Sequence, residues 1–155
     1  MRTKFDDHFL ENIELVIFGA NDKKNLLKTE FKTHYAGFIK DDEILRSYYS
    51  ACDLFILPSR QDNLPGTGIE SHSCGTPIVS FDIGGLSDII DNKKTGSLAK
   101  PFDPSSLASE IHWAIENDER NILLKKASRK KALDVWDEKK ISKIFADFYF
   151  EVYNQ

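Results

Sequence analysis

The residues whose types and spacing could carry chemistry gather in one polar segment, residues 58–70, which reads PSRQDNLPGTGIE. It follows the predicted strand Asp53–Leu57 and leads directly into a predicted helix. In open parallel sheets, ligands bind beyond the carboxyl ends of the strands, near the point where the strand order reverses. We therefore expect the binding site of this chain in that segment.

The start of the predicted helix offers donors for an anion. Free backbone N–H groups at Gly66, Thr67 and Gly68 would face a bound phosphate, and the helix dipole would add to the attraction. The glycines let a phosphate approach the backbone closely. The segment does not match GxxxxGK[ST], so the pattern does not indicate a P-loop.

Two carboxylates in the segment have both structural and functional interpretations. Thr67-x-x-Glu70 fits a capping box, in which Glu70 would bond back to the N–H of the cap residue. Asp62, taken alone, fits a turn residue. Either side chain could instead meet a ligand, and the local pattern leaves both interpretations open.

The elements that must position this segment alternate between strand and helix. We expect strands at Ile13–Phe18, Thr33–Ile39, Asp53–Leu57, Pro77–Phe81 and Gly96–Ala99. Helices are expected after Asp41, from Thr67 to Gly75, from Asp103-Pro104 onward, and at Glu119–Asp134 and Glu138–Tyr153. This order predicts an α/β fold with a Rossmann-like, mostly parallel sheet and flanking helices. We expect one domain over residues 1–155, with C-terminal helices from about residue 103.

The last predicted helix carries an aromatic face that should pack on something. Ile141, Ile144, Phe145, Phe148 and Tyr149 recur at helical spacing. We expect this face to pack on the core of the domain itself.

Three stretches together resemble the donor-binding domain of group 1 (family 4) glycosyltransferases, which are retaining, metal-independent enzymes of GT-B architecture. The stretches are Tyr49–Ser59, Gly75–Val79 and Gly84–Asp88, and the similarity runs from about Ile13 to Asn117. Asp62 and Glu70 have seven residues between them, the spacing of the paired-acid motif of that family. Here an Asp stands where most members have the first Glu.

The resemblance implies roles for individual residues. Glu70 would accept hydrogen bonds from the ribose hydroxyls of a nucleotide, and Asp62 would touch the donor sugar. The amides of Gly66, Thr67 and Gly68 would face the sugar and diphosphate. The remaining substrate-binding candidates are Gly19, Ser59, Arg60, Pro65, Gly84 and Gly85. Without the resemblance, Gly19 fits a strand-ending turn and Arg60 a solvated loop residue.

The resemblance also implies missing parts. A complete donor domain has a further first strand with a Gly-Arg loop and a lysine, and faces an N-terminal acceptor domain. In the sheet order 3-2-1-4-5-6 the first strand is central, so Ile13–Phe18 and Asp53–Leu57 would flank a gap. We expect these two strands to pair directly, another chain to fill the slot, or the piece to be marginally stable. We expect no transferase activity from this chain alone.

Composition and charge exclude several other classes of protein. The net charge of −4 gives no basic footprint for nucleic acid. The four histidines are dispersed and the two cysteines suit buried thiols, so we expect neither a metal nor another cofactor besides the nucleotide-sugar substrate. No transmembrane segment or targeting signal is evident, which favours a cytoplasmic location with peripheral membrane contact of the parent protein left open.

The function expected from the resemblance is sugar transfer from a nucleotide-diphosphate sugar to a glycan or lipid-linked acceptor, with retention, in cell-surface polysaccharide biosynthesis. Three alternatives stay open. The chain could be a non-catalytic nucleotide- or sugar-binding module, a nucleotide-sugar epimerase of similar architecture, or a flavodoxin-like signalling domain. The last would need an acidic cluster after the first strand, and residues 19–22 supply a weak one. Base, sugar and acceptor are not specified by the sequence.

Overall fold

A computed structural model describes residues 10–19 and 29–154, and residues 1–9, 20–28 and 155 are not described further. The acidic cluster weighed for a signalling domain and the histidine at position 8 therefore lie outside the described residues, apart from Gly19. The chain divides into two compact units, residues 1–47 and 48–155. The expectation of one domain stays a prediction.

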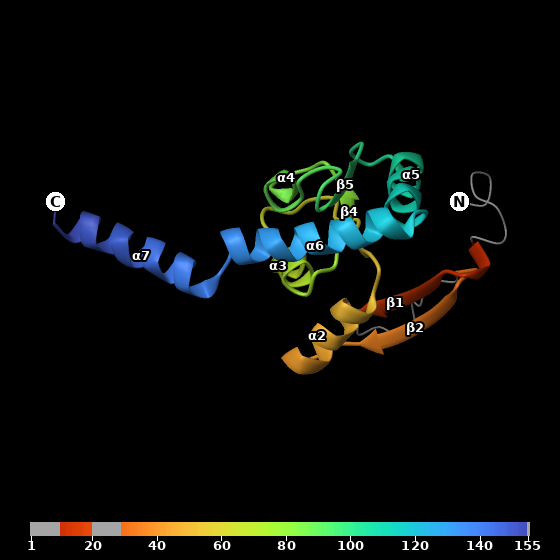
Figure 1. The fold of residues 1–155 in the computed structure, drawn as a ribbon, viewed down its shortest axis with the longest axis horizontal. Coiled ribbons are helices and arrows are strands. Elements are labelled where there is room, and N and C mark those ends of the chain that lie inside the picture. Colours follow the sequence, from red (N-terminus) through yellow and green to blue (C-terminus); the bar gives the residue numbers. More distant parts are fainter. Residues whose placement is uncertain (1–9, 20–28, 155) are drawn as a thin grey trace. The chain divides into compact units, whose positions relative to one another are not determined.

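The first unit is built on a pair of parallel strands (Figure 1). β1 spans Glu14–Phe18 and β2 spans Lys32–Gly37, which ends two residues earlier than the strand expected there. The Glu14 carboxylate lies 2.7 Å from the Lys32 ammonium and 2.7 Å from Nε2 of His34 on the paired strand. Helix α2, Asp42–Ala51, begins in the first unit and ends in the second.

The second unit holds a three-stranded parallel sheet in the order β3-β4-β5. The strands are Phe55–Leu57, Ile78–Phe81 and Gly96–Ala99. Strand β4 is the central one and is fully buried. Gly96 is required beside it, because a Cβ at position 96 would lie 1.9 Å from the carbonyl oxygen of Ile78.

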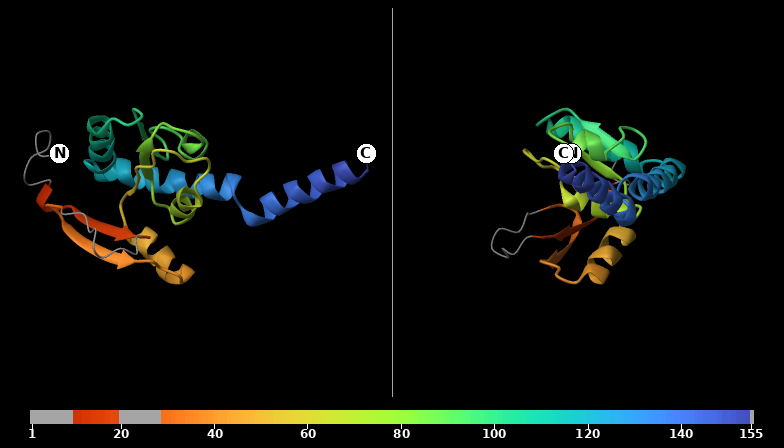
Figure 2. Two further views of the ribbon diagram at one scale, coloured as in Figure 1. Left: turned by 180° about the vertical axis from the view of Figure 1, so that it is seen from behind. Right: turned by 90° about the vertical axis from the view of Figure 1, so that its left-hand side faces the viewer.

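Helices cover both faces of this sheet (Figures 1 and 2). Helix α3 is Gly66–Ser73 and the short α4 is Leu86–Ile89. Helix α5, Pro104–Ile115, packs on β4 and β5, and α6, Asp118–Val135, packs on α5 and α3. The chain ends with α7, Glu138–Tyr153.

The core follows from the alternation of side chains along β4. Ile78 joins Ile89 and Ile90 in one cluster, while the next residue, Val79, joins a second cluster with side chains of α5 and α6. Successive strand residues point to opposite faces, so a strand covered by helices on both sides is apolar throughout. The strand expected at Pro77–Phe81 is confirmed as β4, and its apolar run has this reason.

The predicted α/β class with parallel, helix-flanked sheets is confirmed. The three outcomes considered for the gap stay predictions, because β1 belongs to the first unit and β3 to the second. The packing expected for the last helix is wrong. No described residue of α7 is buried, and Figure 2 shows the helix running on beyond α6.

Candidate functional site

The segment expected to carry the chemistry forms the connection from β3 to α3 in the second unit. Strand β3 ends at Leu57, and α3 begins at Gly66 with Pro65 as its N-cap residue. Pro65 has extended backbone angles, φ −67° and ψ 121°. Proline has no N–H to satisfy, so it suits a position just before the first free amides of a helix. The connection therefore places the start of α3 at the carboxyl edge of the sheet, as expected.

The start of α3 has no side-chain cap. The Gly66 and Thr67 amides belong to the first turn, whose N–H groups have no acceptor within the helix, and can face a ligand. The Gly68 N–H instead donates to the Pro65 carbonyl at 3.0 Å, unlike the free donor expected there. A Cβ on Gly68 would lie 3.2 Å from Cδ1 of Ile89. Gly68 therefore allows α3 to pack closely on α4.

Glu70 lies one turn into α3 and does not cap it. The capping-box interpretation is wrong, because the N-cap residue is Pro65 rather than Thr67. The Glu70 side chain is exposed, and its Oε2 accepts a hydrogen bond of 3.2 Å from the Tyr49 hydroxyl. Its Oε1 lies on the Gly66 side, 4.0 Å from where a Cβ on Gly66 would stand. One carboxylate oxygen is thus held and the other faces the helix start.

Asp62 is held in the loop by two different contacts. Its Oδ2 accepts a hydrogen bond of 3.1 Å from the Ser59 hydroxyl. The backbone carbonyl oxygen of Asp62 lies so close to Gly84 that a Cβ on Gly84 would be only 1.9 Å from it. A Cβ on Gly85 would come within 2.0 Å of the Asn63 carbonyl oxygen. The Gly84-Gly85 turn therefore packs directly against the backbone that carries Asp62.

Arg60 and Gly19 have different surroundings. The exposed Arg60 guanidinium lies over the ring of Phe102, 5.7 Å from its centroid, at the loop before α5. Gly19 ends β1 in the first unit, where its N–H donates to the Gly37 carbonyl at 2.8 Å and its φ is +87°. The positive φ explains the glycine as a turn. Contact of either residue with a ligand stays a prediction.

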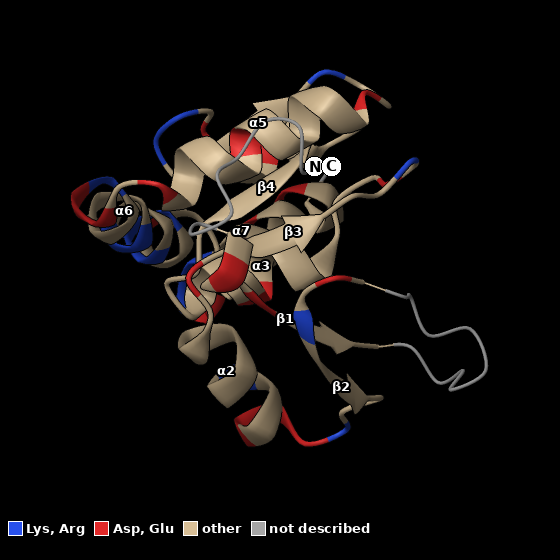
Figure 3. Ribbon diagram, turned by 90° about the vertical axis from the view of Figure 1, so that its right-hand side faces the viewer, with Lys and Arg blue, Asp and Glu red and all other residues tan. Residues whose placement is uncertain are grey.

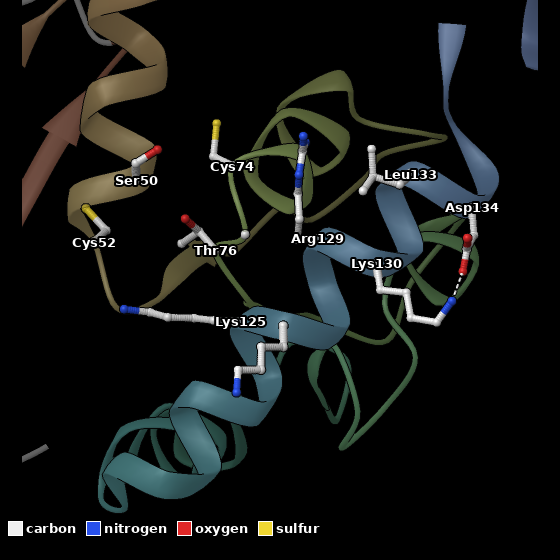
Figure 4. A pocket seen from close by; sticks show the side chains of 11 residues that line it. Ser50, Cys52, Cys74, Thr76, Lys125, Arg129, Lys130, Leu133 and Asp134 are labelled. Atoms are coloured by element: carbon white, nitrogen blue, oxygen red, sulfur yellow. Dashed lines mark hydrogen bonds and ion pairs between the residues drawn. The ribbon is translucent and has the colours of Figure 1, made fainter. Parts of the chain in front are cut away.

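A surface cleft of about 650 Å³ lies elsewhere in the second unit, at the opposite end of α3 (Figure 4). Its basic side chains from α6 are largely paired: Lys125 with Asp53 at 2.6 Å, and Arg129 with the Ser73 carbonyl. Figure 3 shows the blue Lys and Arg residues along α6. Burial raises the pKa of the Cys52 thiol in this cleft, which fits an unreactive cysteine. None of the predicted site residues lines it.

The described residues 10–19 and 29–154 contain no group of three or more His, Cys, Asp or Glu side chains that could hold a metal ion. No helix in that part of the chain is long and apolar enough to cross a membrane. The residue that sequence reasoning missed is Tyr49. The pattern marks it as an apolar position of α2, and nothing in the sequence links its hydroxyl to Glu70, 21 positions away.

Comparison with known proteins identifies the family of this chain. Residues 5–131 match the family described as glycosyl transferases group 1. The chain is 28% identical, over 146 residues, to the N,N'-diacetylbacillosaminyl-diphospho-undecaprenol alpha-1,3-N-acetylgalactosaminyltransferase of Campylobacter jejuni, covering 91% of this chain and 36% of that protein. The chain therefore belongs to the group 1 glycosyl transferase family.

Solved structures show the same fold. The sucrose-phosphate synthase of Thermosynechococcus elongatus is similar with a TM-score of 0.78 and 22% identity, over 90% of this chain and 38% of that chain. The Alr3699/HepE protein of Anabaena, solved in complex with UDP, is similar with a TM-score of 0.70 and 23% identity, over 77% and 32% of the two chains. The chain thus spans about a third of the length of these proteins.

Proposed function

We propose that this chain is the donor-binding part of a glycosyltransferase that uses a nucleotide-diphosphate sugar. The observation that carries the proposal is the pairing of an exposed carboxylate, Glu70, with an uncapped helix start at Gly66 and Thr67 on the same helix. A carboxylate suits ribose hydroxyls and a helix N-terminus suits a diphosphate, so the two chemistries of a nucleotide are matched side by side. The relative solved with UDP supports a nucleotide as ligand.

In this proposal each group acts where charge is present or develops. The amides of Gly66 and Thr67 and the dipole of α3 stabilise the leaving diphosphate, a task that a cation performs in other transferases. Arg60, on the same loop, adds a positive charge. Asp62, oriented by Ser59, meets the donor sugar. Gly84 and Gly85 fix the loop that carries Asp62, which is how they contribute to substrate binding.

The remainder of the reaction belongs to parts outside this chain. Its relatives are about three times as long, and an N-terminal domain would bring the acceptor. We propose that the parent enzyme transfers the sugar with retention to a glycan or lipid-linked acceptor, in cell-surface polysaccharide biosynthesis on the cytoplasmic side. The name of the Campylobacter jejuni relative, which refers to an undecaprenol-linked sugar, supports a lipid-linked acceptor.

An NMR titration of the labelled chain with UDP, GDP and ADP tests donor binding. We expect one nucleotide to shift the amide signals of Gly66–Glu70, and Glu70→Gln to weaken its binding about tenfold or more. The reason is that hydrogen bonds to a charged acceptor contribute about 1.5–3 kcal/mol, and about 1.4 kcal/mol is a factor of ten.

A matched control is Glu119→Gln, which removes the same charge from an exposed position in the first turn of α6. This variant should bind like the wild type. Well-dispersed spectra that respond to none of the three nucleotides would contradict the proposal. Equal weakening by both substitutions would show that net charge, rather than a Glu70 contact, governs binding.

A further inference from the structure

The Tyr49 hydroxyl is the polar group that contacts the Glu70 carboxylate inside the second unit. Tyr49 lies in the last turn of α2 with 2% of its surface exposed. Its hydroxyl donates to Oε2 of Glu70 at 3.2 Å. Glu70 itself is exposed, so a buried donor holds one oxygen of a carboxylate that otherwise reaches solvent. A buried tyrosine hydroxyl needs a partner, and here that partner is a proposed ligand-binding side chain.

The tyrosine ring is fixed on several sides. It meets the Phe55 ring of β3 edge-on, with centroids 5.3 Å apart and an interplanar angle of 86°. The backbone carbonyl of Tyr49 accepts a hydrogen bond of 2.6 Å from the hydroxyl of Thr76, which precedes β4. The ring of Tyr49 is therefore held by β3 and its backbone by the segment before β4, which together fix the position of the hydroxyl. A flexible Glu side chain gains a defined orientation from such a donor.

The hydroxyl also stays protonated. Burial, together with the neighbouring Glu70 carboxylate, raises the pKa of Tyr49 above its ordinary value. It consequently acts as a donor throughout the neutral range. With Oε2 held by Tyr49, Oε1 is left on the Gly66 side of the helix, where it can accept from the ribose hydroxyls of a nucleotide whose diphosphate binds at the helix start.

We propose that Tyr49 is a positioning residue that orients the Glu70 carboxylate for the ribose hydroxyls of the donor nucleotide. The proposal rests on the proposed function and adds a residue to it. Tyr49 does not touch the nucleotide, because its ring is buried and packs edge-on against Phe55 of β3. It acts through Glu70, whose side chain it orients before the nucleotide binds. The Glu70 side chain therefore loses less conformational freedom on binding.

The test uses Tyr49→Phe, which keeps the packed ring and removes the hydroxyl. We expect about a tenfold loss of affinity for the nucleotide selected by the titration above, as for one hydrogen bond to a charged group. For the 2′,3′-dideoxy form of the same nucleotide the loss should be under about twofold, because the ribose hydroxyls that Glu70 serves are absent. In a Glu70→Ala background, Tyr49→Phe should cause no further loss.

The matched control is Tyr48→Phe, which removes a hydroxyl from the adjacent residue of α2 and should leave the affinity unchanged. A ligand-free measurement supplements it: Tyr49→Phe should shift the side-chain carboxyl ¹³C signal of Glu70, and Tyr48→Phe should not. Equal losses for the ribose and dideoxy nucleotides, or an undiminished loss in the Glu70→Ala background, would overturn the proposal by showing that Tyr49 acts on the fold in general. Wild-type chain that binds no nucleotide would refute the proposed function itself, and the role of Tyr49 with it.

Discussion

Two adjacent glycines determine where the Asp62 loop can lie. Gly84 has a φ of +51°, a conformation that side chains disfavour, and a Cβ at Gly85 would overlap the Asn63 carbonyl oxygen at 2.0 Å. Such a contact with backbone cannot be relieved by a rotamer change. The loop must move instead, and the Asp62 carboxylate moves with it.

We expect Gly85→Ala to lower the free energy of unfolding by about 1–3 kcal/mol, the usual range for inserting an atom into a packed region. Urea unfolding measures the loss, and amide shifts at residues 59–63 report the displaced loop. Gly66→Ala is the matched control for stability, since its Cβ would meet only Oε1 of Glu70, at 4.0 Å. Unperturbed signals at residues 59–63 in Gly85→Ala would contradict the packing described here.

At the level of elements, α6 and α7 differ in what they contribute to the unit. Helix α6 buries Asn121, Leu124, Ser128 and Ala132, and Trp136 after it packs against the cluster around Ile78. Helix α7 has no buried residue in the described structure, and its aromatic side chains Phe145, Phe148 and Tyr149 are each more than half exposed. The N-terminus of α7 is capped by Asp137, whose carboxylate accepts hydrogen bonds from the amides of Lys139 and Lys140.

Removal of residues 138–155 should therefore change the unfolding free energy of the second unit by less than about 0.5 kcal/mol, as for other surface changes. Trp136→Ala in the shortened chain should cost about 2–4 kcal/mol, because it removes a large, partly buried ring. Thermal or urea unfolding of the full chain, the shortened chain and its Trp136→Ala variant measures both effects. A large loss from the truncation alone would mean that the aromatic face of α7 is covered by this chain.

On the scale of the whole unit, His72 joins parts that are distant in sequence. It is fully buried in α3, its ring stacks on Trp136 with centroids 6.0 Å apart, and its Nε2 lies 3.1 Å from the Thr95 carbonyl before β5. Because a carbonyl only accepts, Nε2 carries the proton and donates. Nδ1 is then a buried acceptor without a partner in the described structure. Burial lowers the pKa of His72 to about 4.

This pKa gives the unit an acid-sensitive stability. Between the ordinary value near 6.5 and about 4, the unfolded chain binds a proton that the folded chain does not, so stability falls as the pH falls. We expect a loss of about 2 kcal/mol at pH 5 relative to pH 7.5 from this group. Urea unfolding at the two pH values measures it. His72→Gln, which keeps a donor for Thr95 but does not titrate, should reduce the loss, and an identical loss in that variant would assign the effect to other groups.

Much of this architecture was available in the sequence because it depends on local rules. Strand β4 is apolar since both of its faces are covered, and the Asp103-Pro104 pair starts α5 as predicted, with the Asp103 carboxylate accepting from the amides of Ser105 and Ser106. The placement of Glu70 near a helix start also followed from its spacing. Periodicity and capping act within a few residues, so they can be read without knowing the fold.

The tertiary structure alone decided how the site residues are held. Thr67-x-x-Glu70 fits a capping box in sequence, yet the N-cap residue of α3 is Pro65, two positions before Thr67, and Glu70 accepts a hydrogen bond from a tyrosine of another helix. The need for glycine at positions 84 and 85 comes from backbone that lies some twenty residues earlier in the chain. Such contacts depend on distances between segments that are remote along the chain. A linear pattern identifies the residue types of this site, but only packing fixes which oxygen of Glu70 is held and which is free.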